Sequence, residues 1–184
     1  TPATRLVMVD AVTSPTGIVV PVDSLIDQLE PDVPVLVDAA HAPGMIPLDL
    51  ESLGASIVVG KCHKWMCAPK GAGFLYVRED QRDSAIPATV SHGWNTSSPP
   101  GESRFHNLFD WMGTDDPSAQ LSVPTAIETI GSLHTEGWPG VMAANHELVI
   151  KGREIVCSAL GIDEPISAND GGSLATVPRP GGRC

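Results

Sequence analysis

Asp38, His63 and Lys64 have the side-chain types that chemistry at a carbonyl group requires. Lys64 stands between a histidine and a tryptophan in the segment GKCHKWMCAPKGAGFLYV, residues 60–77. A lysine that is shielded from water can lose its proton and attack a carbonyl carbon. Taken alone, Lys64 also fits a solvated surface lysine. The adjacent His63, and Asp38 at the end of another apolar segment, favour the chemical interpretation.

These residues match the needs of pyridoxal phosphate chemistry. That chemistry uses a lysine for a Schiff base, a carboxylate that keeps the pyridine nitrogen protonated, and donors for a phosphate group. Lys64 and Asp38 are candidates for the first two tasks. For His41 and His63 a simpler alternative stays open, because a histidine at a strand end can cap the strand by bonding to its backbone.

Three other motifs indicate different chemistry and are weaker. Cys62, His63 and Cys67 suggest a metal site, but no second pair of residues with zinc-ligand spacing follows. NHELVI begins like the helix of a zinc protease, yet Ile150 stands where the second histidine is required. GAG at 71–73 lacks the third glycine and the preceding strand of a dinucleotide-binding motif. We therefore expect no metal site.

The elements that would position these side chains alternate along the first 80 residues. Short apolar segments predict strands at 4–12, 33–41, 56–61 and 73–77, and apolar residues at helical spacing predict a helix over 21–30. Such alternation predicts an α/β fold with a mainly parallel sheet that is covered on both faces. Ligands bind beyond the carboxyl ends of parallel strands. The residues expected there are Asp38, His41, His63 and Lys64.

The second half of the chain has a different composition. Residues 91–118 are rich in Gly, Pro, Ser and aromatic side chains and show no periodicity. A connection of that length in a compact domain is more often functional than not. A helix is predicted to resume near residue 119, and a long amphipathic helix over 141–161 is predicted to end at Gly161. The segment 171–180 resembles the first strand of a new unit.

Composition limits the partners and the location. The chain has 184 residues and a net charge of -11, which argues against nucleic acid and anionic membranes as partners. No apolar run approaches the length of about 20 residues that spans a bilayer. The four cysteines form no dense disulfide pattern and no secretory signal is present, so we expect a cytoplasmic protein. The first residue is Thr and the chain ends in PRPGGRC, as expected for a piece of a longer polypeptide.

The motifs together resemble those of a known family. VDAAHAPG, followed by CHKWMCAPKGAGFLYV, is similar to the class V aminotransferase family of fold-type I pyridoxal phosphate enzymes, and most of all to its isopenicillin N epimerase-like branch. DAVTSPTG, SHGW, FDWMGTDDPS and SLATVPRP match that branch in the same order. The resemblance thus covers nearly the whole chain.

The resemblance implies a fold and a division into domains. Residues 1–135 are expected to form part of the large cofactor-binding domain, a three-layer, mainly parallel α/β structure like that of aspartate aminotransferase. Residues 136–184 are expected to form the linking helix and the start of a small C-terminal α+β domain. The chain is roughly half the usual family length, so further phosphate-binding, ring-stacking and substrate-binding residues are expected outside it.

The resemblance also implies the role of each site residue. Lys64 matches the Schiff-base lysine, Asp38 the partner of the pyridine nitrogen, and His63 a phosphate contact. His41 and Ser14 match positions near the phenolic oxygen of the cofactor. Thr114 matches a threonine that reaches the phosphate of the neighbouring subunit, which implies a homodimer with shared active sites.

Three residues depart from the family pattern. Lys61 stands where relatives usually have Ser or Asn facing the phosphate, and Ala11 replaces a His that often precedes TSPT. Asp115 stands where the motif GTRD would have Arg. That change reverses a charge near an anionic cofactor or substrate, which argues against anion binding there.

The function that follows is a pyridoxal phosphate enzyme that acts on an amino acid. The first expectation is an isopenicillin N epimerase-like epimerase or class V aminotransferase. The alternatives are a carbon–sulfur lyase or cysteine desulfurase-like enzyme, and a catalytically incomplete fragment or degenerate paralogue with a structural role. The desulfurase role needs a mobile nucleophilic cysteine, and Cys62 and Cys67 lie too close to Lys64 for a long reach.

Overall fold

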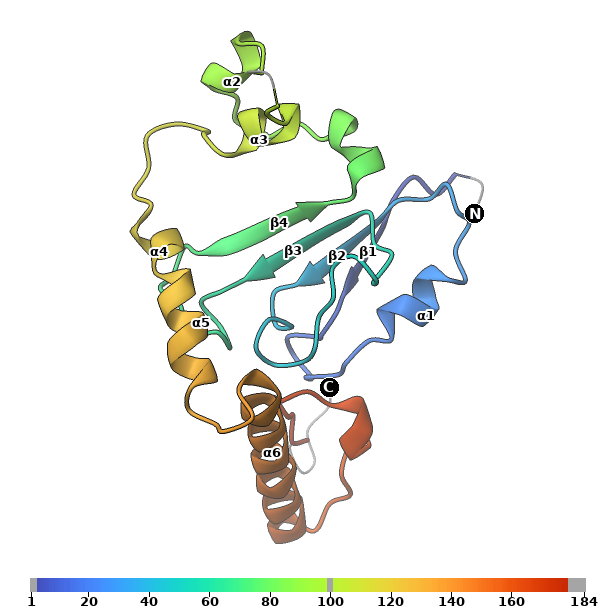
Figure 1. Ribbon diagram of the computed structural model, residues 1–184. Coiled ribbons are helices and arrows are strands. Elements are labelled where there is room, and N and C mark those ends of the chain that lie inside the picture. Colours follow the sequence, from blue (N-terminus) through green and yellow to red (C-terminus); the bar gives the residue numbers. More distant parts are fainter. Residues whose placement is uncertain (1–2, 99–100, 179–184) are drawn as a thin grey trace.

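A four-stranded sheet forms the centre of the computed structural model, which describes residues 3–98 and 101–178 (Figure 1). Its strands lie side by side in chain order: β1 (Val7–Asp10), β2 (Val35–Ala39), β3 (Ile57–Lys61) and β4 (Gly73–Val77). The first three are parallel, and β4 runs antiparallel to β3. The prediction of a mainly parallel sheet is confirmed, and the carboxyl ends of β1, β2 and β3 meet at one edge.

One face of the sheet holds the main core. Val37 and Val58 are fully buried there, and the register places Val9 and Tyr76 on the same face. Residues of α1 (Val22–Ile26) and of the loop 46–53 pack against this layer. Gly60 is required in it, because a Cβ at this position would overlap the ring of Phe74.

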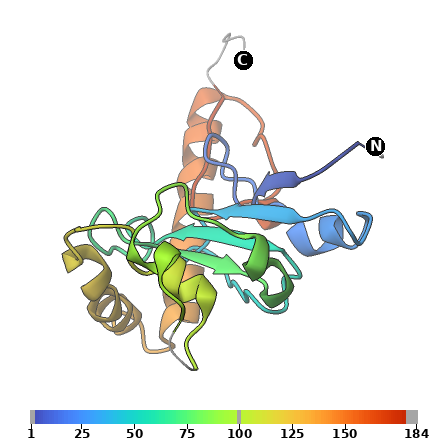
Figure 2. The same ribbon diagram turned by 90° about the horizontal axis from the view of Figure 1, so that it is seen from above.

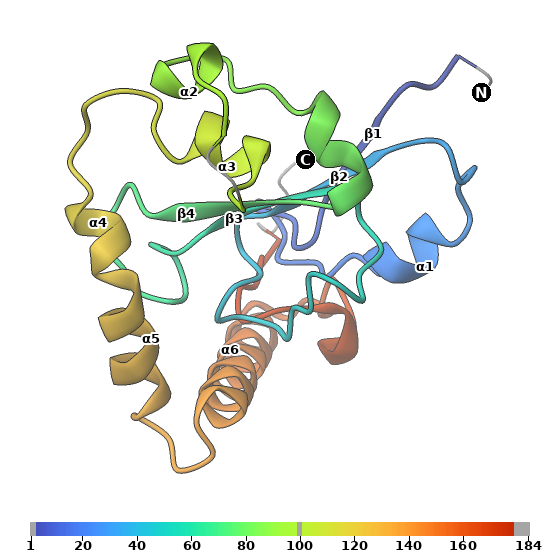
Figure 3. The same cartoon turned by 45° about the horizontal axis from the view of Figure 1, so that its top comes forward.

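The opposite face of the sheet is less covered. Helices α2 (His92–Asn95) and α3 (Arg104–Phe109) lie on this side, whereas α1 and α6 lie on the other (Figure 3). Met8 on β1 is 65% exposed and Leu75 on β4 is 38% exposed. The two strands at the margins of the sheet therefore present apolar side chains to solvent within the described part of the chain.

Helices flank the sheet at both ends. Helix α1 lies at one end, and α4 (Ser118–Leu121) and α5 (Val123–Gly131) lie at the other (Figure 2). Helix α5 packs its Val123 and Ala126 against a small apolar cluster in the loop before β4, formed by Cys62, Ala68 and Ala72. The same loop carries the predicted Schiff-base lysine, so α4 and α5 support the site.

The long helix α6 (Trp138–Leu160) ends at Gly161, which has the left-handed conformation (φ 64°). This end was predicted from the sequence. The predicted helix over 21–30 is shorter than expected, because the backbone hydrogen bonds of Gln28 and Leu29 reach back only three residues and Pro31 disfavours helical geometry at the residue before it.

The predicted strand over 171–180 is absent from the described residues of that segment, 171–178. Gly171 instead makes an isolated antiparallel bridge with Ile18, and the N–H of Gly172 donates to the carbonyl of Gly17 at 2.8 Å. A side chain at Gly17 would overlap the carbonyl of Leu174. The segment thus packs on the loop after β1, while the division into domains at residues 135 and 136 stays a prediction.

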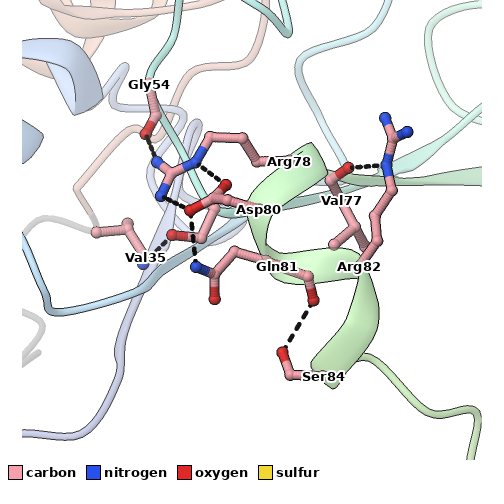
Figure 4. Close-up of polar contacts among 9 residues, drawn as sticks. Val35, Gly54, Val77, Arg78, Asp80, Gln81, Arg82 and Ser84 are labelled. Carbon is pink, nitrogen blue, oxygen red and sulfur yellow. Dashed lines mark hydrogen bonds and ion pairs between the residues drawn. The ribbon is translucent and has the colours of Figure 1, made fainter.

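A polar network fixes the chain after β4. The guanidinium of Arg78 donates to both carboxylate oxygens of Asp80, at 2.6 and 2.9 Å, and to the carbonyl of Gly54 at 3.1 Å (Figure 4). These bonds hold the pKa of Asp80 well below its usual range. Arg78 therefore joins the 3-10 helix η1 (Glu79–Ser84) to the turn before β3.

Among the described residues, no helix is both long and apolar enough to span a membrane.

Candidate active site

The candidate site lies where the parallel strands end. Asp10 closes β1, Asp38 is the fourth residue of β2, and the segment 62–64 follows β3 directly. Asp10 and Asp38 are register partners on adjacent strands, so their side chains are neighbours on the same face. Two carboxylates so close together favour a cation beside them.

Asp38 is held by its own loop. Its Oδ1 accepts a hydrogen bond of 2.8 Å from the N–H of Ala40. Its second oxygen has no hydrogen-bond partner among the described residues. The half-buried carboxylate is therefore fixed in orientation with one acceptor left over for a further group.

Lys64 lies in the loop that crosses from β3 to β4. Its carbonyl accepts from the N–H of Cys67 at 3.2 Å, which closes a tight turn, and Cys67 has a positive φ of 57°. The side chain of Lys64 is half-buried and makes no hydrogen bond or ion pair with any described residue. The turn thus holds an unpaired amine at the carboxyl edge of the sheet.

The Cys62 thiol is 5% exposed, and burial raises its pKa. A thiol that stays protonated is a poor nucleophile. His63 beside it is half-buried, and its Nδ1 is buried without a hydrogen-bond partner in the described part of the chain. Most buried polar atoms in folded proteins are hydrogen-bonded, so this nitrogen is available to a water, an ion or a ligand.

His41 is the centre of a short chain of polar contacts. Its Nε2 lies 3.3 Å from Oγ of Ser14, and its Nδ1 accepts from the indole N–H of Trp65 at 3.4 Å. Burial lowers the pKa of His41, and so does the charge of Lys64, whereas Asp38 and Asp10 act to raise it. The imidazole of His41 therefore lies among side chains from strands β1 and β2 and from the loops that follow β1 and β3.

The pairing of His41 with Ser14 is not that of a serine hydrolase. In such an enzyme the base accepts the hydroxyl proton on one nitrogen and donates from the other to a carboxylate. Here the second nitrogen faces Trp65, which can only donate. The neutral ring must then carry its proton on Nε2, so it has no lone pair with which to activate Ser14.

Thr114 is the predicted site residue that the structure does not bring to the others. It is exposed in the segment between α3 and α4, and no hydrogen bond among the described residues joins it to Lys64, Asp38 or His41. Its predicted role, contact with a neighbouring subunit, is compatible with exposure and stays a prediction.

The three departures from the family pattern occupy different environments. Lys61 and Asp115 are exposed, and neither makes an ion pair within the described chain. The carboxylate of Asp115 accepts from the N–H of Asp116 at 2.8 Å, so it serves its own turn. Ala11 is buried at 5% exposure, where a larger side chain would need space.

Two residues near the site were missed at the sequence level. Asp10 was not singled out, although Val-Asp-Ala occurs at the ends of both β1 and β2 and would have indicated paired carboxylates. Trp65 was noted as the neighbour of Lys64 in the sequence, and not as a partner of His41. Its hydrogen bond to His41 depends on the relative position of two loops, for which the sequence contains no signal.

The pH dependence of His41 is the first testable consequence. Because Lys64 lowers the pKa of His41, Lys64→Ala is expected to raise it, and a histidine NMR titration would measure the change. The folded pKa is below the ordinary 6.5 of an unfolded chain. Unfolding therefore takes up a proton between the two values, and stability falls as pH drops through that window. An unchanged His41 titration in the variant would contradict this account.

Comparisons with known proteins show the family of this chain. Residues 1–130 match the family model for aminotransferase class V. The chain is 32% identical over 181 residues to a putative L-cysteine desulfhydrase 1 of Oryza sativa subsp. japonica, covering 96% of this chain and 36% of that protein. It is 34% identical over 196 residues to the isopenicillin N epimerase of Amycolatopsis lactamdurans, covering 98% and 48%. The chain therefore spans less than half the length of these relatives.

A solved structure shares the fold. The apo cysteine desulfurase of Thermococcus onnurineus NA1 superimposes with a TM-score of 0.72 at 21% identity, over 92% of this chain and 42% of that one. This likeness confirms the predicted fold class, and the family model confirms the resemblance seen in the motifs. The chain belongs to the class V aminotransferase family, whose enzymes depend on pyridoxal phosphate.

Proposed function

We propose that this chain carries the cofactor-binding part of an enzyme that acts on an α-amino acid through Lys64. The observation that carries the proposal is the half-buried, unpaired amine of Lys64 at the same sheet edge as Asp38 and His41. An amine that no carboxylate neutralises is available to a carbonyl group.

The residues present fit pyridoxal phosphate. Lys64 supplies the amine for the aldehyde, and Asp38 has a free carboxylate oxygen for a protonated ring nitrogen. The orphaned Nδ1 of His63 is available to a phosphate oxygen. Ser14 and His41 form the polar pair that would face the phenolic oxygen. Each assignment pairs a hydrogen-bond donor, an acceptor or the amine of this chain with a group of the cofactor that has the complementary chemistry.

The cofactor supplies an electron sink that makes the α proton of an amino acid acidic. Lys64 holds the cofactor at rest. The free amine of Lys64 would take a proton from the α carbon of the amino acid and return it. Asp38 would hold a protonated ring nitrogen, and its register neighbour Asp10 would favour that positive charge. Thr114 would serve the phosphate of a second subunit in a homodimer with shared active sites.

Two outcomes follow from the same proton removal. Return of the proton on the opposite face gives an epimerase, and the 34% identical isopenicillin N epimerase supports that outcome. Loss of a β substituent gives a carbon–sulfur lyase, and the 32% identical putative desulfhydrase supports that one. A desulfurase with a nucleophilic cysteine is less supported, because Cys62 is buried with a raised pKa and the exposed Cys67 is held in the same tight turn as Lys64.

A panel of L-amino acids tests the proposal and chooses between the outcomes. The protein loaded with pyridoxal phosphate is incubated with each amino acid, and the D-isomer, pyruvate and sulfide are measured. The D-isomer identifies an epimerase, and pyruvate with sulfide from L-cysteine identifies a lyase. Cofactor binding without turnover of any member would support the catalytically incomplete fragment. Failure to bind the cofactor at all would overturn the proposal.

A further inference from the structure

The loops after β2 and β3 meet through the side chains of His41 and Trp65. Both loops follow adjacent parallel strands, and both are closely packed. Gly44 in the first loop has a φ of 82°, and a Cβ there would lie 2.9 Å from the carbonyl carbon of Trp65. The positions of the two side chains are therefore set by backbone contact between the loops.

The hydrogen bond between these side chains has a direction. An indole N–H only donates, and a histidine nitrogen accepts only when it carries no proton. The contact of 3.4 Å from Nε1 of Trp65 to Nδ1 of His41 thus selects the neutral ring with its proton on Nε2. Nε2 faces Oγ of Ser14 at 3.3 Å, so the ring donates on that side.

We propose that Trp65 is a positioning residue that holds His41 as a neutral donor with its proton on Nε2. Without the indole N–H, either nitrogen could carry the proton and His41 could also become doubly protonated. The groups that act on this ring are Lys64, which opposes a positive charge, and Asp38 and Asp10, which favour one. Trp65 adds to the effect of Lys64, because its N–H repels a proton on Nδ1.

The consequence for catalysis rests on the proposed function. A neutral histidine donates one hydrogen bond to an anionic oxygen such as a phenolate without adding a full positive charge near Lys64. Because His41 stays neutral, the amine of Lys64 has no second positive charge beside it on that side. The tautomer itself, however, is a property of this chain alone and can be measured without any cofactor.

Nitrogen-15 NMR of histidine-labelled protein without cofactor tests the proposal. The His41 signals are assigned by their loss in His41→Gln. In the unchanged protein at neutral pH, we expect Nδ1 to have the shift of an unprotonated nitrogen and Nε2 that of a protonated one. In Trp65→Phe, which keeps an aromatic ring, we expect both tautomers and a raised His41 pKa.

The matched control is Trp111→Phe, because Trp111 is exposed and makes no hydrogen bond within the described residues. It should leave the His41 signals unchanged. Circular dichroism checks that each variant is folded. If the unchanged protein carries the proton on Nδ1, or if a folded Trp65→Phe keeps a pure Nε2 tautomer, the proposal is overturned. A separate absorbance titration with pyridoxal phosphate reports on the proposed function. Failure of the tautomer proposal can therefore be distinguished from failure of the proposed function.

Discussion

Lys64→Ala is expected to abolish the visible absorbance that pyridoxal phosphate acquires on forming a Schiff base with the protein. The side chain of Lys64 is the half-buried amine at the carboxyl edge of the sheet, and alanine leaves no nucleophile there. Turnover of the amino acid that the panel identifies should fall by at least about 10²–10⁴-fold, the usual contribution of a positioned acid–base group.

The control is Lys70→Ala in the same loop. Lys70 is exposed and makes no hydrogen bond or ion pair with the described residues, so both absorbance and turnover should stay unchanged. If the band is lost in Lys70→Ala but not in Lys64→Ala, the cofactor is bound to Lys70 and the assignment to Lys64 is wrong. A band that survives in both would show that neither lysine holds it.

Of the substitutions proposed for this chain, Glu164→Ala is expected to lower the free energy of unfolding the most. Arg153 on α6 has a side chain only 1% exposed, and its Nε donates to Oε2 of Glu164 at 2.7 Å. Its Nη2 lies 2.6 Å from the same oxygen, as an ion pair without hydrogen-bond geometry. Removing the carboxylate leaves a buried, unpaired guanidinium, which costs about 3 kcal/mol, the lower end of the range for such pairs because Glu164 is 38% exposed.

Chemical denaturation measures this loss. Arg153→Met combined with Glu164→Ala should be more stable than Glu164→Ala alone, since the double variant buries no charge. Glu154→Ala, an exposed position on the same helix, should change the free energy of unfolding by no more than about 0.5 kcal/mol. If Glu164→Ala and Glu154→Ala are equally stable, water must hydrogen-bond to the guanidinium of Arg153 once the carboxylate of Glu164 is removed.

The sequence predicted local elements better than it predicted contacts between them. The four strands follow from runs such as Val35–Ala39, and the end of α6 follows from Gly161. These signals are local, because each depends on the preferences of a few adjacent residues. The segment 171–178 was predicted wrongly as a strand, since its bonds to the loop near Gly17 join residues far apart in the chain.

The same distinction applies to the site. The grouping of Asp38 and Lys64 could be predicted, because the carboxyl ends of parallel strands share one edge of a sheet. The ion pair of Arg153 with Glu164 could not, since it requires the chain to reverse after Gly161 and return along α6. The hydrogen bond from Trp65 to His41 could not be predicted either, because it requires the loops after β2 and β3 to bring these two side chains together.

The margins of the sheet have a consequence for handling this chain. Alternate backbone groups of β1 face away from β2, and among the described residues no other strand pairs with them. Such an edge is a template for the strand of another molecule, and the exposed Met8 adds an apolar contact. The net charge of -11 opposes that association by repulsion, so added salt should promote aggregation of the purified chain.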